Sequence, residues 1–310
     1  MLIVVNAKSN SGNGLLKWEL IEKKLRKNQE KYNAVFTSDN ENARNVICQA
    51  MKDGHKHFVA AGGDGTVNSV LNSLIDPETD QPFKDVTLGA IGLGSSNDFQ
   101  KPFDDREFID GIPLRVNNEK TCLSDIGKVE FKDTNDMVHK RYFIINSSIG
   151  LIANGNAFFN GDNIILKWLK RKNVDAAIMF TTLIVLMKNK AVNTKLVFKQ
   201  DGGNRFFVTN LSILKNVHFA GDMLYDTPVK EDDGMFAINL WENMGRFRIL
   251  KTTLALYKGK FKGLARTRTW QDNALKILPE KPVFLEVDGE TYLVKEASFT
   301  IIPKAINVCG

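Results

Sequence analysis

Short apolar runs alternate with longer amphipathic stretches along the first hundred residues. Short strand-like runs lie at residues 2–5, 58–61 and 86–91, and a further strand ends near residues 35–36. Three stretches between them repeat apolar residues at helical spacing, at residues 15–31, 43–51 and 67–74. The first of these would bury one side made of Leu16, Leu20, Ile21 and Leu25. This alternation predicts an α/β domain with a largely parallel, doubly wound sheet.

The pattern changes after about residue 115. Strand-like runs come first, at 121–131 and 141–147, and a mostly helical stretch follows at 163–186, interrupted near Asn173. From residue 195 onward, short strands recur with turn residues between them. They lie at 196–198, 206–208, 236–240, 273–277, 283–287, 291–294 and 298–302, with one helical pattern at 247–257. This half of the chain predicts an antiparallel β-sandwich or barrel.

Composition narrows the class of protein. The chain has 310 residues, 43% of them apolar, and a net charge of +6, which suits a globular protein that favours anionic partners. Its three cysteines lack metal-ligand spacing and predict reduced thiols in the cytoplasm. We find no secretory signal, and the longest apolar run, 176–187, is too short to span a bilayer. Any contact with a membrane is therefore expected to be peripheral.

Two glycine-rich turns carry the most informative chemistry. The first, Gly62-Gly63-Asp64-Gly65-Thr66, follows a predicted strand, and Thr66 would cap the next helix. Such a turn exposes backbone N–H groups and the positive end of a helix to a phosphate. The carboxylate of Asp64 would repel a bare phosphate, so it indicates a bridging cation or a structural hydrogen bond. The second turn runs from Gly92 to Phe99 and carries Asp98, and in a parallel sheet both turns would share the ligand-binding edge.

Three further acidic positions are ordinary turn residues when each is taken alone. They are Asp125, Asp232-Asp233-Gly234 and Asp288-Gly289-Glu290, the last being the two-residue turn that antiparallel hairpins favour. The chain has no Walker A pattern, and its four histidines have no zinc-ligand spacing.

Taken in order, these segments resemble the diacylglycerol kinase catalytic family, in particular its small bacterial lipid kinases, and more distantly the sphingosine and ceramide kinases. Gly62-Gly63-Asp64-Gly65-Thr66 with Asn68 matches the family signature, and Gly94-Ser95-Ser96-Asn97-Asp98-Phe99 matches its Gly-Thr-x-Asn-Asp-Phe turn. The first loop, Asn6 to Gly12, is a degenerate form of the family loop, with Ala7 in place of proline. Further matches are Thr37, Ala220-Gly221-Asp222-Met223, Pro228, Asp232-Asp233-Gly234 and Asp288-Gly289-Glu290.

The resemblance implies two domains. A Rossmann-like, doubly wound nucleotide-binding domain would comprise residues 1–120, with the tail 303–310 returning to it, and an antiparallel β-sandwich for the lipid would comprise 121–302. A cleft between them would hold the reactants. The implied reaction transfers the γ-phosphate of ATP to a lipid hydroxyl with Mg²⁺, as part of phospholipid metabolism. An NAD-kinase-like enzyme that uses the same glycine turn, and a non-catalytic nucleotide- or lipid-binding module, stay open as alternatives.

The resemblance also implies roles for individual residues. Glu290, with Asp288 beside it, would be the general base, and Asp64 would also take part in catalysis. Asp64, Asp98 and Asp125 would order Mg²⁺ and water near the phosphates. Asp233 would hold a second, structural metal ion together with the backbone carbonyls of Lys230 and Met235. The expected nucleotide contacts are Asn6, Ser9, Ser11, Gly12, Thr37, Gly62, Gly63, Asp64, Gly65, Thr66, Asn68, Ser69, Ser95 and Asn97.

A lipid substrate requires access to a membrane. Residues 245–268 contain eight basic side chains and no acidic one, and a second basic cluster occupies 167–172. Basic residues near an anionic bilayer each contribute on the order of 1 kcal/mol, although either cluster alone could be a solvated face. We expect peripheral binding to the inner, cytoplasmic face of the membrane and, because no nucleic-acid module is recognisable, no nucleic-acid partner. The acceptor lipid and the formation of a homodimer stay open.

Overall fold

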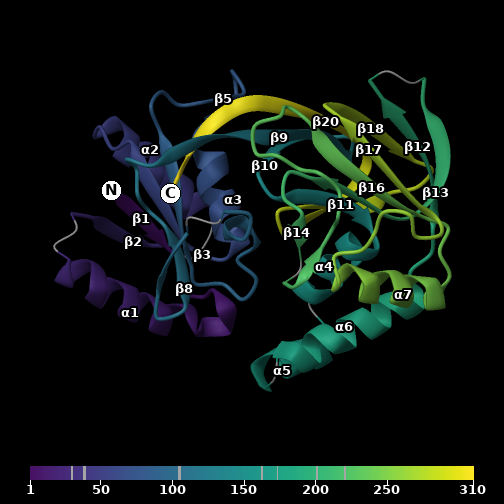
Figure 1. Ribbon diagram of the computed structural model, residues 1–310, viewed down its shortest axis with the longest axis horizontal. Coiled ribbons are helices and arrows are strands. Elements are labelled where there is room, and N and C mark those ends of the chain that lie inside the picture. The colour runs from purple at the N-terminus through teal and green to yellow at the C-terminus, as the bar shows by residue number, and fades with distance from the viewer. Residues whose placement is uncertain are drawn as a thin grey trace. The chain divides into compact units, whose positions relative to one another are not determined.

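A computed structural model describes residues 1–28, 31–37, 40–103, 106–161, 163–172, 174–199, 202–219 and 221–310. Asn173 and Ala220, each part of a sequence-based prediction, lie outside these residues. The chain divides into two compact units: unit 1 is Met1–Ile126 with Ile302–Gly310, and unit 2 is Gly127–Ile301. Two strands, β9 (Thr121–Asp133) and β20 (Glu290–Cys309), contribute residues to both units (Figure 1).

Unit 1 is built on a parallel sheet. Four strands pair in the order β2-β1-β3-β6, and all neighbours run parallel. They are β1 (Leu2–Val5), β2 (Asn33–Phe36), β3 (His57–Gly62) and β6 (Thr87–Gly92). The end of β20 also runs parallel to β6, whereas β8 pairs antiparallel with β6 and with β7. The remaining strands are β4 (Ile75–Asp76), β5 (Gln81–Pro82), β7 (Glu107–Ile109) and β8 (Ile112–Arg115).

Three helices accompany this sheet: α1 (Gly14–Lys27), α2 (Asn40–Lys52) and α3 (Asp64–Ser73). Helix α1 packs Trp18, Ile21 and Leu25 onto the strands. The prediction that Leu16 and Leu20 belong to its buried side was wrong, since they are 62% and 49% exposed. Trp18 buries a larger apolar surface than a leucine and lies on the same helix face as Ile21 and Leu25, so this face turns toward the sheet.

Unit 2 is mostly antiparallel. Hydrogen-bonded pairs link β12, β13, β11, β19, β20 and β18 in a closed circuit, in which β13 and β20 each change partner along their length. Strands β16 and β17 extend from β13, and β10 pairs with β9. The bounds are β10 (Val138–Phe143), β11 (Asn146–Gly150), β12 (Val192–Phe198), β13 (Asn204–Leu214), β14 (His218–Phe219), β15 (Met223–Leu224), β16 (Phe236–Glu242), β17 (Thr267–Asp272), β18 (Ala274–Pro279) and β19 (Val283–Val287). Their inward side chains form one apolar core that includes Phe143, Leu211, Phe236 and Phe299.

The described helices of unit 2 are α4 (Leu151–Asn160), α5 (Ile164–Lys172), α6 (Val174–Lys188) and α7 (Arg246–Leu256). Figure 1 shows α4, α6 and α7 below the strands of this unit. Helix α4 packs on β11, β19 and α6, and α6 in turn contacts α5 and α7. Within the described part of the chain, we find no helix with the length and apolar character needed to cross a membrane.

Candidate active site

The two glycine turns of unit 1 pack directly on each other. The backbone N–H groups of Leu93 and Gly94 both donate to the carbonyl of Gly62, at 2.9 and 3.2 Å. A Cβ on Gly94 would lie 2.5 Å from the Cα of Gly63, so a side chain there would force the turns apart. The carboxyl ends of β3 and β6 therefore meet, as the sequence predicts for neighbouring parallel strands.

Asp64 joins these two turns. Its carboxylate accepts hydrogen bonds from the backbone N–H groups of Asp98 and Phe99, at 3.1 and 3.0 Å. Asn97, with a left-handed φ of 53°, closes the second turn by accepting the N–H of Gly94 at 3.0 Å. The structural hydrogen bond, one of the two roles that the sequence left open for Asp64, is therefore formed.

Asn6 connects the first loop to α3. Its side-chain amide donates to the hydroxyl of Thr66 at 3.2 Å, and its backbone N–H donates to Ala61 at 2.9 Å. The prediction that Thr66 caps α3 was wrong, because the helix already begins at Asp64, with Gly63 at the N-cap position. Thr66 lies inside the first turn, where its backbone N–H donates to the carbonyl of Gly63.

The other expected nucleotide contacts follow the same strand ends. Ser9 precedes the short 3₁₀ helix η1 (Asn10–Gly12), which holds Ser11 and Gly12, and the side chain of Ser11 lies outside the described residues. Thr37 directly follows β2 and is buried, whereas Ser95 is exposed in the second glycine turn. Gly65, Asn68 and Ser69 lie on α3. The structure therefore gathers the predicted set at the carboxyl ends of β1, β2, β3 and β6.

The three carboxylates expected to order Mg²⁺ do not form one group of ligands. Asp98 begins the 3₁₀ helix η2 (Asp98–Gln100) beside Asp64, and its carboxylate accepts a hydrogen bond from the Lys101 ammonium at 2.6 Å. Asp125 on β9 instead accepts the backbone N–H of Lys304 at 2.8 Å. Within the described residues, no three or more His, Cys, Asp or Glu side chains are arranged to hold a metal ion.

In unit 2, Asp288 and Gly289 form the two-residue turn between β19 and β20. Both have positive φ, 43° and 93°, as the favoured hairpin turn requires. The buried carboxylate of Asp288 accepts the backbone N–H groups of Ile144, Ile145 and Asn146 at 2.9 to 3.1 Å. Glu290 follows the turn and is exposed. Asp288 therefore holds the turn in place, while Glu290 faces solvent.

Glu286 supports the same turn and was missed at the level of the sequence. Its side chain is buried, accepts the backbone N–H of Gly289 at 2.7 Å and accepts the hydroxyl of Ser148 at 2.8 Å. A charged residue inside the otherwise apolar run 283–287 was the available signal. Two buried carboxylates thus fix the turn that carries Glu290.

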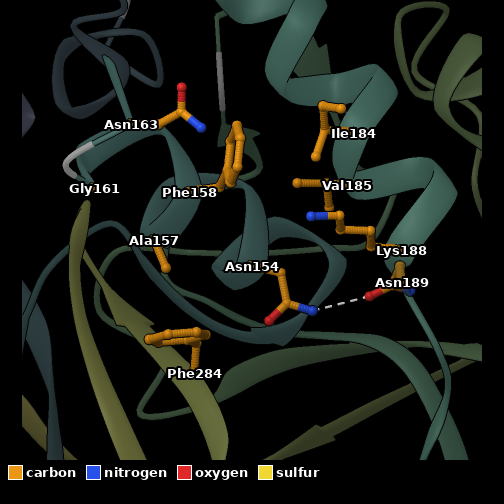
Figure 2. A pocket seen from close by; sticks show the side chains of 10 residues that line it. All are labelled: Asn154, Ala157, Phe158, Gly161, Asn163, Ile184, Val185, Lys188, Asn189 and Phe284. Carbon is orange, nitrogen blue, oxygen red and sulfur yellow. Dashed lines mark hydrogen bonds between the residues drawn. The ribbon is translucent and has the colours of Figure 1, made fainter. Parts of the chain in front are cut away.

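A pocket of about 530 Å³ lies between α4 and α6 (Figure 2). Its lining is Asn154, Ala157, Phe158, Gly161, Asn163, Ile184, Val185, Lys188, Asn189 and Phe284. The amide of Asn154 donates to Asn189 at 3.0 Å, which links the two helices. The side chain of Asn160, at the end of α4, donates to the carbonyl of Gly289 at 3.5 Å. The helix that lines the pocket therefore also touches the turn before Glu290.

The three oxygen atoms expected to bind a structural metal ion do lie together, but they surround a side chain. The ammonium of Lys215 lies 2.8 Å from the carbonyl of Lys230, 3.0 Å from that of Met235 and 3.2 Å from the carboxylate of Asp233. The position expected for a metal ion is therefore taken by the chain's own cation.

Comparison with known proteins shows which family these features resemble. Residues 1–129 match the model of the diacylglycerol kinase catalytic domain. The family resemblance found in the sequence is thereby confirmed. Two relatives, each named probable lipid kinase YegS-like, are similar to part of this chain. The protein from Pectobacterium atrosepticum is 33% identical over 133 residues, which are 41% of each chain. The protein from Pseudomonas savastanoi pv. phaseolicola is 32% identical over 93 residues, which are 28% of this chain and 27% of that relative. The aligned part thus spans less than half of either relative.

Solved structures extend the likeness to both units. A crystal structure from Bacillus anthracis strain Sterne, provisionally described as a diacylglycerol kinase, matches 99% of this chain and 94% of its own with a TM-score of 0.72. The sequences are 17% identical, so this likeness concerns the fold alone. The chain shares the fold of this Bacillus anthracis protein.

Proposed function

We propose that the protein is a lipid kinase that transfers the γ-phosphate of ATP to a hydroxyl group of a lipid, with Mg²⁺ as cofactor. Unit 1 is its Rossmann-like nucleotide-binding domain, and unit 2 is the antiparallel β-domain that takes the lipid. Three observations support this: the family match over residues 1–129, the loops gathered at one edge of the parallel sheet, and an exposed carboxylate on a rigid turn beside an apolar pocket.

The nucleotide binds at the carboxyl ends of β1, β3 and β6. The N-terminus of α3 directs backbone N–H groups and a positive helix dipole toward the phosphates, and Asn6 fixes the first loop against that helix. Asp64 and Asp98 are neighbouring acidic residues, since the backbone N–H of Asp98 donates to the Asp64 carboxylate, and they would help to hold a Mg²⁺ ion at the phosphates. When bound, this ion neutralises charge on the transferred phosphate. Asp125, bonded to Lys304, has a structural role in this scheme.

Glu290 is the general base, and its setting is the observation that carries the proposal. Phosphoryl transfer depends on positioning and charge neutralisation, and a positioned base adds about 10²–10⁴-fold. Asp288 and Glu286 hold the turn through backbone N–H groups, so the Glu290 carboxylate stands on a fixed backbone. It accepts the proton of the lipid hydroxyl as that oxygen bonds to the γ-phosphorus and the bond to ADP breaks.

The pocket between α4 and α6 receives the apolar part of the lipid. Its volume of about 530 Å³ falls in the range of small-molecule sites, roughly 300–1,000 Å³. Phe158, Val185 and Phe284 give it an apolar wall, and two of its polar side chains, Asn154 and Asn189, are hydrogen-bonded to each other. Because α4 ends against Gly289, a lipid in this pocket has its headgroup within reach of the turn that carries Glu290.

The test is incubation of the purified protein with labelled ATP, Mg²⁺ and fractionated total lipid, followed by identification of the product. We expect one labelled lipid. Glu290→Gln should lower turnover by about 10²–10⁴-fold with unchanged ATP binding. Glu280→Gln, which alters an exposed glutamate elsewhere in unit 2, is the matched control and should keep full activity.

Each other outcome contradicts a defined part of the proposal. Full activity of Glu290→Gln would remove the base assignment. Label appearing on NAD in a parallel reaction would favour the NAD-kinase-like alternative. Absence of labelled product from every lipid fraction and from NAD would leave a binding module.

The protein reaches its lipid by binding peripherally to an anionic bilayer through α7. This helix buries Ile249, Thr252 and Leu256 in unit 2. Its opposite side presents Phe247, Leu250 and Leu254 to solvent, 81%, 48% and 56% exposed. A helix with a second, outward apolar side and basic flanks is typical of segments that insert into the bilayer interface.

The positive charge around α7 indicates that the partner of this face is an anionic membrane. Eight basic side chains in 245–268 are all exposed, and the segment has no acidic residue: Arg246, Arg248, Lys251, Lys258, Lys260, Lys262, Arg266 and Arg268. Helix α5 offers a second apolar set, with Ile164, Ile165 and Trp168 at 84%, 58% and 56% exposed, although its basic side chains lie outside the described residues. The location that this implies is the inner face of the membrane, where ATP and anionic lipid are both present.

A further inference from the structure

The side chain of Lys215 is removed from solvent. It directly follows β13, and its side chain is 1% exposed. Its backbone N–H donates to Ile145 at 2.9 Å, so the start of the side chain is anchored in the strand layer. From there the ammonium reaches the segment 230–235, where it contacts two carbonyls and the Asp233 carboxylate.

This arrangement leaves no room for a divalent cation. An ammonium has three N–H donors, and three oxygens stand at hydrogen-bond distance from it. Mg²⁺ or Ca²⁺ would need about six or more oxygen ligands at roughly 2.0–2.6 Å. An ion drawn to the same oxygens would also lie against a buried positive charge, which Coulomb repulsion strongly disfavours. The residues present do not fit the metal ion that the family resemblance implies.

We propose that Lys215 takes the place of a structural metal ion, and that its ammonium holds the segment 230–235 to the end of β13. The Asp233 carboxylate also accepts the backbone N–H of Met235 at 3.0 Å, so the segment is folded around the same oxygen that meets the ammonium. Unit 2 is then stable without any divalent cation. This inference does not depend on the catalytic role proposed above.

The same geometry predicts what removal of the ammonium does. Lys215→Met keeps most of the apolar stem but leaves a carboxylate and two carbonyls without their cation. Breaking a buried charge pair from one side is strongly destabilising, so we expect the Tm to fall by roughly 5 °C or more. Because the vacated oxygens are the ligand type that Ca²⁺ and Mg²⁺ prefer, millimolar Ca²⁺ should recover part of this loss.

The experiment compares thermal unfolding of the full chain in EDTA, in Mg²⁺ and in Ca²⁺, with metal content measured by mass spectrometry. The variants are wild type, Lys215→Met, the double variant Lys215→Met/Asp233→Asn, and Lys230→Met as the matched control. Lys230 offers only its carbonyl to the site and its side chain is exposed, so its loss should leave the Tm unchanged. Rescue by Ca²⁺ should be present in the single variant and absent from the double variant.

The metal content and Tm of the wild type test the proposal even if a variant fails to fold. A chain that carries no divalent cation and has the same Tm with and without EDTA supports the proposal. A wild type that carries one tightly bound cation and loses stability in EDTA, with both effects removed by Asp233→Asn, overturns it. A Tm of Lys215→Met equal to that of the wild type in EDTA overturns it as well.

Discussion

The backbone N–H of Asn146 donates to the Asp288 carboxylate at 2.9 Å and ties the start of β11 to the turn between β19 and β20. The neighbouring N–H groups of Ile144 and Ile145 bind the same carboxylate. Asp288, for which the family resemblance implied a catalytic part beside Glu290, therefore positions the backbone of this turn. Within the Asp-Gly-Glu motif, the Asp288 carboxylate fixes the backbone of the turn, and the Glu290 side chain is exposed.

Removal of the Asp288 carboxylate should destabilise unit 2. Asp288→Ala would leave three backbone N–H groups without their acceptor, and each unsatisfied buried group costs about 1–3 kcal/mol. We expect a loss of roughly 3 kcal/mol or more in the free energy of unfolding, measured in urea. Glu290→Gln, at an exposed position of the same hairpin, should stay within about 0.5 kcal/mol of the wild type. Equal urea midpoints for Asp288→Ala and wild type would contradict the positioning role.

The strands and glycine turns of unit 1 could be predicted from the sequence for a simple physical reason. A strand buried on both faces must be a short apolar run, and the residues from Phe58 to Ala61 are 0% exposed. The turns that follow such strands need glycine where two backbones approach closely, as Gly63 and Gly94 do. Local sequence therefore specifies both the strand and the loop.

What could not be predicted depends on contacts between distant segments. Helix α4 contains Gly155 between two asparagines, and all three residues have low helix propensity. The helix forms because it packs on β11, β19 and α6. Lys215 carries no local signal at all, since only the fold brings it to Asp233. The oxygens around it are the same whether a metal ion or an ammonium binds them, so the motif alone indicates a cation without saying which one.

His57 should make the stability of unit 1 sensitive to acid. Burial, with a smaller contribution from the positive N-terminus, lowers the pKa of His57 to about 4, against 6.5 for an exposed histidine. Well above pH 6.5 the ring is neutral in both the folded and the unfolded state and has no effect on stability. As the pH falls from 6.5 to 4, His57 becomes protonated in the unfolded chain but stays neutral in the folded chain. The unfolded state is thereby favoured, so the free energy of unfolding decreases. The full loss is at most about 3 kcal/mol, and less because the ring is only partly buried.

The measurement is urea unfolding at pH 7.0 and pH 5.0. His57→Thr removes the ring from β3 and should show a smaller decrease between the two pH values than the wild type does. His55→Thr, which removes a histidine outside that strand, should keep the wild-type decrease. An identical pH dependence in all three proteins would mean that His57 does not titrate as proposed.

The outward side of α7 should be needed for binding to vesicles and not for folding. Phe247→Ser/Leu254→Ser removes two exposed apolar side chains, and Lys251→Gln/Lys258→Gln removes two exposed charges, one on α7 and one just after it. Each basic residue contributes on the order of 1 kcal/mol at an anionic surface, so the second pair should weaken binding about thirty-fold. Co-sedimentation with vesicles of phosphatidylcholine, with and without phosphatidylglycerol, measures this.

A matched control separates this helix from exposed apolar residues in general. Leu16→Ser/Leu20→Ser alters two exposed leucines of α1 in unit 1 and should keep wild-type binding. All variants should unfold at the wild-type urea concentration, because the altered side chains are exposed. With a short-chain, water-soluble form of the accepted lipid, the α7 variants should also keep their turnover, which distinguishes loss of docking from loss of catalysis. Equal binding of the wild type to neutral and anionic vesicles, or undiminished binding by both α7 variants, would exclude this face as the membrane contact.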